Sequence, residues 1–438
     1  MATQPITKGV KPLQTVMPIT APVSYARPLA IVTTLFFMWG FLTSLNDILV
    51  PHLKSIFELS YARVMLIQFA FFSAYFLFSL PWSKIVNAIG YQRTMVTGLL
   101  TMAVGAFLFV PAASLASFPL FLGALIVLAA GITGLQVAAN PYVVVLGKES
   151  TASSRLNLTQ AFNSLGTTIA PKLGGLLILS AAPLAIEELH SLSPQALQLY
   201  RVQQAASVKM PYIVITAALV LLAVMIAMSK LPRIEGATCG PGTTVADSVW
   251  KHPNLVLGAL GIFAYVGAEV SIGSFLVNYF GQPDIAGFSP RTAAGYVSFY
   301  WGGAMIGRFL GAALLRRIKT GQLLAICAIC TSALVSISML TGGHTAMWTI
   351  LAVGFFNSIM FPSIFSLGVA ELGCLTGNAS GILNMAIVGG AILPLLQGVI
   401  ADRIGIHHAF FVPVLCYLYI LFYALSGSKP NSERYTAA

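Results

Sequence analysis

Three carboxylates lie within or beside long apolar stretches of the sequence: Asp47, Glu269 and Glu371. A charged side chain inside a bilayer is costly, so each of these acids is a candidate functional residue. A carboxylate in such surroundings holds a proton more readily than in water, and it can load that proton on one side of a membrane and release it on the other. We therefore predict that Asp47 couples transport to a cation. A structural acid paired with a buried donor is the alternative.

Glu269 follows Tyr265 by one helical turn, so both side chains can reach one cavity. This carboxylate could accept hydrogen bonds from ligand hydroxyls, titrate or ligate sodium, and a role in helix packing is the alternative. We predict it as a second cation-coupling residue that also contacts the ligand. Glu371 stands near the end of an apolar segment, where a gating or solvated position is expected.

Amides form a second set of polar residues in apolar stretches. Gln136 and Asn140 are four residues apart, and Gln160 and Asn163 are three apart, so each pair shares one helix face. Amides carry both donors and acceptors, which suits a ligand covered in hydroxyls, although hydrogen bonding between helices is the alternative. An aromatic ring such as Phe361 could stack on a sugar. We predict a neutral-polyol cavity formed by Asn46, Gln136, Asn140, Gln160, Asn163, Tyr265, Glu269, Asn357, Phe361 and Asn384.

The composition decides the class of protein. Only 8% of the 438 residues are charged, 57% are hydrophobic and mean hydropathy is +0.87, whereas soluble domains carry roughly 25% charged residues. The net charge of +11 comes from Lys and Arg scattered at segment ends, which form no basic stripe for nucleic acid. We see no nucleophile–base pair and no metal-ligand cluster. The sequence predicts an all-α, multi-spanning membrane protein that is neither an enzyme nor the holder of a cofactor or metal.

Twelve segments are long and apolar enough to cross a bilayer as helices, each needing about 20 residues. We place them at 28–51, 63–83, 94–113, 118–147, 155–180, 211–229, 253–280, 292–314, 320–341, 345–370, 378–401 and 407–427. A polar linker at 230–252 divides them six and six. This predicts a tail at 1–27, six-helix bundles at 28–229 and 253–427, and a second tail at 428–438.

Lys and Arg fix the expected orientation, because they gather on the cytoplasmic side of membrane proteins. With both termini inside, 16 of them fall on the cytoplasmic side and 6 on the other, with Lys172 left within a span. Both termini and the linker are therefore predicted to be cytoplasmic.

The two halves repeat short patterns in the same order. Asn140-Pro141 precedes a Leu-Gly pair as Phe361-Pro362 does, and Leu156-Asn157 recurs as Leu383-Asn384. A six-plus-six repeat is typical of the major facilitator superfamily, whose substrate site lies between the halves.

Within that superfamily, the sequence resembles the fucose permease branch, and most of all its bacterial glucose/galactose transporters. The stretches that carry the resemblance are LNDILVPHLKSIF (45–57), GLQVAANPYVVVLG (134–147), SSRLNLTQAFNSLGTTIAP (153–171), YVGAEVSIGSFLVNY (265–279) and SIMFPSIFSLGV (358–369). The resemblance implies a monomeric, multi-pass protein of the bacterial inner membrane that imports a monosaccharide with a cation.

The resemblance also bears on single positions. The proton-coupled fucose transporters of this branch have an essential Asp that matches Asp47 and an essential Glu where this sequence has Gln136. Aromatic residues of the fucose site appear here as Gly273 and Phe361. Glucose and galactose are therefore the expected substrates, and L-fucose or another monosaccharide is the alternative. Proton and sodium both stay open as the coupling ion, as does a facilitator or exporter of the same fold.

The loop between the second and third segments resembles the superfamily's loop motif, with Gly90 and Arg93 in place but without its usual acid. Gly307-Arg308-Phe309 looks like its partner in the second half. We expect Arg93 and Arg308, with Glu371, to gate the cytoplasmic side.

Overall fold

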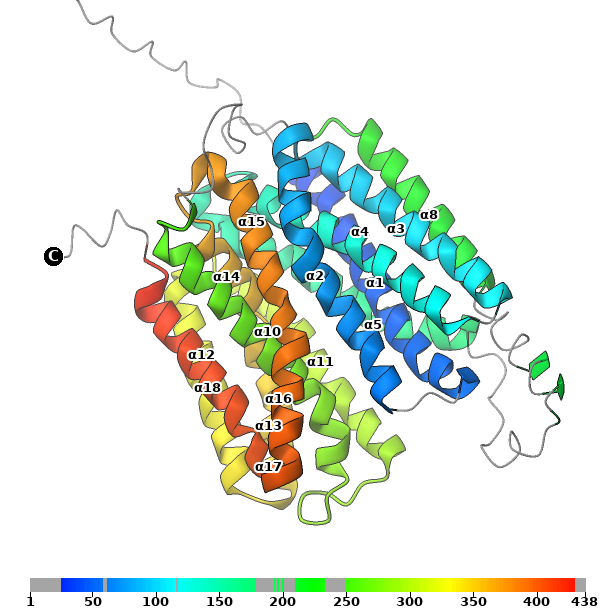
Figure 1. The fold of residues 1–438 in the computed structure, drawn as a ribbon. Helices are drawn as coiled ribbons and strands as arrows, with labels where there is room; N and C mark the ends of the chain where they lie inside the picture. The colour runs from blue at the N-terminus through cyan, green and yellow to red at the C-terminus, as the bar shows by residue number, and fades with distance from the viewer. Residues whose placement is uncertain are drawn as a thin grey trace, which may run out of the picture.

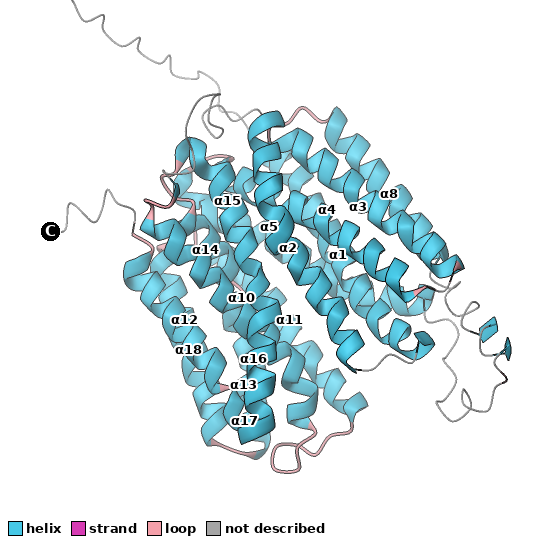
Figure 2. Ribbon diagram, viewed as in Figure 1, coloured by secondary structure: helices cyan, strands magenta, loops and turns pink. Residues whose placement is uncertain are grey.

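The computed structural model describes residues 25–57, 61–115, 117–178, 193, 195–196, 199–200, 209–232 and 249–429, without the side chains of 43, 45–57, 61–66, 68, 171–178 and 290. Within this part of the chain all regular structure is helical (Figure 2), as the sequence predicts. Nine helical stretches are long and apolar enough to cross a membrane. The three other predicted spans coincide with α1 (Ala26–Phe57), α5 (Ala152–Ile178) and α11 (Pro290–Leu314), so the structure is consistent with twelve.

The N-terminal half contains α1, α2 (Tyr61–Ile89), α3 (Tyr91–Ser114), α4 (Phe118–Val145), the short η1 (Glu149–Thr151), α5 and α8 (Lys209–Met228). The C-terminal half starts with α10 (Pro253–Phe280), α11 and α12 (Thr320–Leu340). Its remaining spans are interrupted: α13–α14 (Gly343–Asn357, Met360–Gly368), η2–α15–η3–α16 (Gly373–Leu375, Thr376–Met385, Ala386–Val388, Gly389–Ile404) and α17–α18–η4 (Ile406–Ala409, Phe411–Phe422, Tyr423–Gly427). Figure 1 shows the two bundles side by side.

Equivalent helices pack together in both halves. In order along each half, the first span packs on the fifth (α1 on α5, α10 on α16) and the second on the fourth (α2 on α4, α11 on α13). The third span packs on the sixth (α3 on α8, α12 on α18). The repeated sequence patterns therefore correspond to a repeated packing scheme. The predicted linker and both tails lie largely outside the described residues, so their boundaries stay predictions.

The halves meet mainly through α5 against α11 and α2 against α15. Several hydrogen bonds cross between them near one end of the bundle. Asn87 donates to Asn378, Ser154 donates to the carbonyl of Ala312, and Ser153 is within hydrogen-bond distance of Ser366. This end carries the loops that the charge asymmetry assigns to the cytoplasm. The halves are thus in contact at the predicted cytoplasmic end.

Prolines free two backbone carbonyls where the halves or helices meet. A proline lacks an N–H, so the carbonyl four residues earlier has no helical donor. Pro141 frees the carbonyl of Val137, which accepts from Ser380 at 2.9 Å. Pro362 frees the carbonyl of Ser358, which accepts from Arg308 Nε at 3.3 Å. The helix is broken between α13 and α14 at this point, whereas the sequence predicted one continuous span.

Candidate substrate and coupling site

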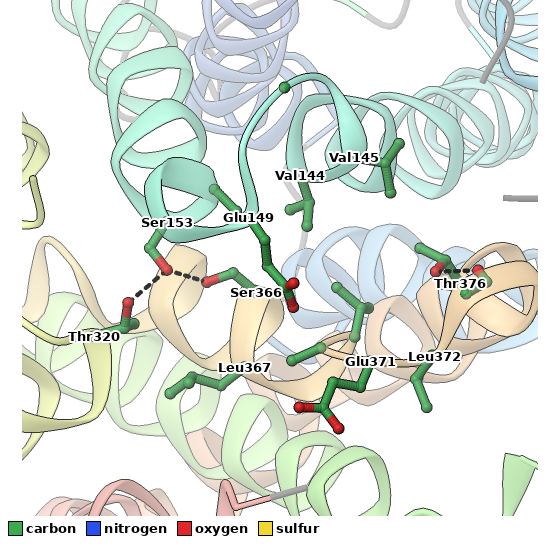
Figure 3. Close-up of a pocket in the computed structure, with 15 residues that line it drawn as sticks. Val144, Val145, Glu149, Ser153, Thr320, Ser366, Leu367, Glu371, Leu372 and Thr376 are labelled. Carbon is green, nitrogen blue, oxygen red and sulfur yellow. Dashed lines mark hydrogen bonds between the residues drawn. The ribbon is translucent and has the colours of Figure 1, made fainter. Parts of the chain in front are cut away.

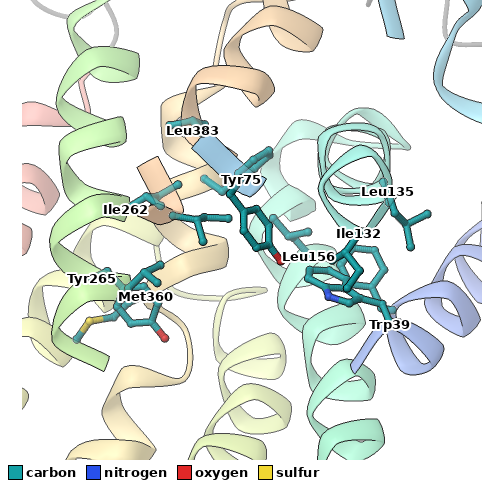
Figure 4. Packing of buried hydrophobic residues seen from close by; sticks show 14 of the residues in the cluster. Trp39, Tyr75, Ile132, Leu135, Leu156, Ile262, Tyr265, Met360 and Leu383 are labelled. Atoms are coloured by element: carbon teal, nitrogen blue, oxygen red, sulfur yellow. The ribbon is translucent and has the colours of Figure 1, made fainter. Parts of the chain in front are cut away.

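Two amide–tyrosine pairs occupy equivalent places in the two halves. Gln136 Nε2 in α4 donates to the hydroxyl of Tyr75 in α2 at 2.7 Å. Asn357 Nδ2 in α13 donates to the hydroxyl of Tyr300 in α11 at 2.8 Å. All four side chains are buried, and Figure 4 shows Tyr75 among the apolar side chains around it. Each pair joins the second and fourth spans of its half.

Glu269 lies in α10 beside a tyrosine and an arginine. The hydroxyl of Tyr265 donates to Glu269 Oε1 at 2.7 Å, and Arg308 Nη2 lies 4.0 Å from the same oxygen. The side chains of Glu269 and Arg308 are 14% and 15% exposed. The one-turn spacing of Tyr265 and Glu269 therefore does bring the two side chains together. The arginine partner was not expected, because the sequence placed Arg308 at the cytoplasmic gate.

Arg308 contacts both halves of the protein. Its Nε donates to the Ser358 carbonyl of its own half, and its Nη1 donates to the Ser164 hydroxyl in α5 of the other half. Ser164 in turn donates to the carbonyl of Gln160 at 3.2 Å. Hydrogen bonds and one ion pair thus connect Tyr265 and Glu269 in one half to Gln160 in the other.

The predicted amides fall into two groups. Asn163 Nδ2 donates to the carbonyl of Phe36 at 2.9 Å, and Asn384 Nδ2 donates within its own helix to the carbonyl of Ser380. Both NH2 groups therefore support packing, while the Oδ1 of Asn384 is buried without a hydrogen-bond partner among the described residues. By contrast, both amide atoms of Asn140 and the Nε2 of Gln160 are buried without a hydrogen-bond partner among the described residues. Buried polar atoms are rarely left unpaired unless they serve a function or meet a ligand or water.

The remaining predicted residues are placed differently. Asn46 and Asp47 lie on α1, but their side chains are outside the described part of the structure. Phe361 is half-buried and packs against Phe365, with ring centroids 6.0 Å apart. Arg93 is exposed at the start of α3.

Glu371 lines a cavity of about 630 Å³ between the halves at the predicted cytoplasmic end. Figure 3 shows Glu371 and Glu149 in this cavity, where Ser153 lies within hydrogen-bond distance of both Ser366 and Thr320. Glu371 adopts a positive φ of 60°, which is uncommon for a residue other than glycine. The lining residues include none of the predicted amides. Glu371 thus lies apart from the predicted amides, and its gating role stays a prediction.

No cluster of three or more His, Cys, Asp or Glu residues able to hold a metal is found among the residues that the structure describes. Among the described side chains, the site offers hydrogen-bonding amides, phenols, one carboxylate and one guanidinium. Such groups can bind hydroxyls and one small cation.

A family model decides the identity of the fold. The model of the Major Facilitator Superfamily matches residues 31–391. The chain belongs to this superfamily. As a member of this superfamily, it is a multi-pass membrane transporter and not an enzyme.

Curated relatives and a solved structure agree with this assignment. The chain is 53% identical to the "Glucose/galactose transporter" of Brucella abortus, over 93% of this chain and 95% of that protein. It is 36% identical to the "L-fucose-proton symporter" of Escherichia coli, over 93% and 94% of the two chains. The crystal structure of "a Major Facilitator Superfamily (MFS) transporter, FucP, in the outward conformation" matches with a TM-score of 0.87 and 35% identity, covering 93% of this chain and 100% of that one. The resemblance to this branch is thus confirmed.

Several site residues of this transporter were not predicted from its sequence: Tyr75, Tyr300, Ser164 and the Ser358 carbonyl. One signal was available for the carbonyl, because Pro362 follows Ser358 by four residues. The repeat held a further signal, since 221 residues separate Gln136 from Asn357 and the same number separates Asn140 from Phe361. The repeat therefore predicted which amides are equivalent, but not which tyrosines they bind.

Proposed function

We propose that this protein imports a neutral hexose of the glucose/galactose type by cation symport. The observation that carries the proposal is a set of buried amide atoms without a hydrogen-bond partner among the described residues: both atoms of Asn140 in α4 and the Nε2 of Gln160 in α5. Donors and acceptors of this kind suit hydroxyl groups, and α4 and α5 pack against each other. The 53% identity to a glucose/galactose transporter supports a hexose as the ligand.

The proposed mechanism is alternating access of the two halves around this site. Asp47 takes up the coupling cation from outside, the sugar binds between the halves, and release of the cation inside frees the sugar. One charge that moves through about 100 mV contributes about 2.3 kcal/mol, which supports substantial accumulation without ATP. Glu269 is a second candidate for the cation or for sugar hydroxyls. The contact between the halves at the predicted cytoplasmic end supports an outward-facing state as the starting point.

L-Fucose is the second candidate substrate, because the fucose–proton symporter of Escherichia coli is 36% identical over 93% of this chain. Purified protein in proteoliposomes, supplied with labelled glucose, galactose and L-fucose under separate proton and sodium gradients, tests both candidates. We expect glucose and galactose to accumulate under one of the two gradients. Equilibration without accumulation would point to a facilitator, and transport of L-fucose alone would reverse the order of the candidates.

The binding residues are tested in the same vesicles with matched variants. N140A and Q160A remove the amides proposed to bind sugar, so we expect KM to rise at least about tenfold, as when a hydrogen bond worth about 1.4 kcal/mol is lost. Q92A is the control, because the Gln92 amide already donates to the carbonyls of Ile226 and Ser229 at the end of α8. An equal rise of KM in all three variants would contradict the assignment.

A further inference from the structure

Arg308 is the only predicted site residue whose contacts, as described, reach from Glu269 to the opposite half. We propose that Arg308 transmits the charge of Glu269 to the contact between the halves, so that a cation on Glu269 loosens the predicted cytoplasmic closure. The proposal rests on the proposed function, because it gives the coupling cation a route by which it changes the conformation. Arg308 acts here as a positioning residue.

The first step of the argument is the setting of the guanidinium. Arg308 donates to the Ser358 carbonyl at 3.3 Å and to the Ser164 hydroxyl, and its Nη2 faces Glu269 at 4.0 Å. The first partner belongs to its own half and the second to the other half. Arginine keeps its charge under all ordinary conditions and presents its donors in a fixed plane. One rigid group therefore faces three partners: Ser164 on α5, Glu269 on α10 and Ser358 at the break between α13 and α14.

The second step concerns how Arg308 reaches these partners. Gly307 allows α11 to approach the α13–α14 segment (span 10 of the twelve) closely, because a Cβ at Gly307 would collide with the Phe355 carbonyl and with Ser358 Oγ. Pro362 leaves the Ser358 carbonyl without a helical donor. The two residues together create an anchor for the Arg308 side chain within its own half.

The third step is the direction of the hydrogen bonds. Ser164 uses its own hydrogen to donate to the Gln160 carbonyl, so its oxygen is oriented to accept from Arg308. Other contacts between the halves, such as Ser154 to Ala312 and Ser380 to Val137, join neutral groups. The Ser164 contact thus involves a charged group that responds to the charge of Glu269.

The fourth step is what happens when Glu269 is neutralised. Among the residues whose side chains the structure describes, Tyr265 and Arg308 interact with Glu269, and Tyr300 and Tyr417 are close enough for an electrostatic effect. None of these four is a second carboxylate. A proton or sodium ion on Glu269 therefore leaves Arg308 with only neutral acceptors in the described part of the chain, and a partly buried cation without a counter-charge is costly. Arg308 then turns away, and its bond to Ser164 is lost.

The experiment measures the distance between the halves in full-length protein in lipid nanodiscs without sugar. Spin labels are attached at K148C and R317C, two exposed positions on opposite halves at the predicted cytoplasmic end, after replacement of the native cysteines. Double electron–electron resonance then gives the ratio of open to closed forms at this end. We expect E269Q to raise this ratio about five- to tenfold, a typical size for coupling between sites.

S164A and S154A are the matched pair that tests the route. Both serines lie in α5 and form a hydrogen bond with α11. Ser164 accepts from the charged Arg308 side chain, whereas Ser154 donates to the neutral backbone carbonyl of Ala312. We expect E269Q to change the ratio less than about twofold in the S164A background and by its full factor in the S154A background. An E269Q effect of equal size in both backgrounds would overturn the proposal.

R308K gives a second test that does not depend on E269Q alone. Lysine keeps the charge near Glu269 but cannot reach Ser164 and Ser358 together, so we expect R308K to match S164A in its open-to-closed ratio and to remove the sensitivity to E269Q. A ratio that stays at the wild-type value in R308K would contradict the proposal. The readout needs no sugar. Failure of hexose uptake would thus reject the proposed function alone. If the protein transports hexose but E269Q and S164A change the open-to-closed ratio independently of each other, only this inference is rejected.

Discussion

The amide of Gln136 donates to the hydroxyl of Tyr75 at 2.7 Å, and both side chains are buried within the N-terminal half. In the other half the amide of Asn357 makes the same contact with Tyr300 at 2.8 Å. Gln136, at the position where the resemblance to the fucose transporters implies a glutamate, thus still makes a polar contact. It connects two helices of one half through a neutral hydrogen bond.

Y75F is expected to lower the free energy of unfolding by about 1 to 3 kcal/mol, because Gln136 Nε2 would be left buried without an acceptor. Thermal unfolding in detergent measures the change. Y296F is the control, since Tyr296 is half-buried, stacks on Phe288 and uses its ring rather than its hydroxyl in the contacts described. A Y75F protein as stable as Y296F would show that Gln136 has another acceptor.

D47N is expected to abolish sugar accumulation and to leave exchange across the membrane largely intact, because a neutral amide can neither take up a proton nor supply the negative charge that binds sodium. Gradient-driven uptake and counterflow, measured in the same proteoliposomes, separate the two activities. D284N serves as the control, because Asp284 lies in the loop after α10 and its backbone carbonyl accepts from Gly343. Normal accumulation by D47N would move the coupling role to another residue such as Glu269.

P362A restores an N–H that can donate to the Ser358 carbonyl and so competes with Arg308 for that acceptor. We expect kcat for sugar transport to fall about tenfold or more, as when a charge-assisted hydrogen bond worth about 1.5 to 3 kcal/mol is lost. P111A is the control, since Pro111 lies in α3 and takes no part in the contacts of Arg308. If both variants transport at the wild-type rate, the break in span 10 is not needed for turnover.

G307A and G302A compare two glycines on one helix. A Cβ at Gly307 would collide with the Phe355 carbonyl and with Ser358 Oγ, whereas a Cβ at Gly302 meets no atom within 4 Å. We expect G307A to lower the free energy of unfolding by about 1 to 3 kcal/mol through overpacking, and G302A to change it by no more than about 0.5 kcal/mol. Thermal unfolding of the two proteins, measured together, gives the comparison. Equal stability would show that α11 can move away from span 10 without loss.

Sequence alone determined the class, the helical fold and the family of this protein. The near absence of charge excluded a soluble fold, and the one-turn spacing of Tyr265 and Glu269 correctly brought those two side chains together. These conclusions depend on hydropathy and helical periodicity, which are local properties of the chain. The equivalence of Gln136 and Asn357 was also available from the repeat.

Only the tertiary structure decided which groups become partners. No sequence pattern indicated that Arg308 reaches Glu269 and Ser164, or that Asn163 donates to the Phe36 carbonyl. Nor did any pattern indicate that Asn140 and Gln160 keep amide atoms without a partner among the described residues. The physical reason is that helical periodicity fixes the face on which a side chain lies, but not the neighbour that the face meets. That neighbour depends on how closely two helices approach and on which groups are free to bond. Here Gly307 permits the close approach of α11 to the α13–α14 span, and Pro362 frees the Ser358 carbonyl for Arg308.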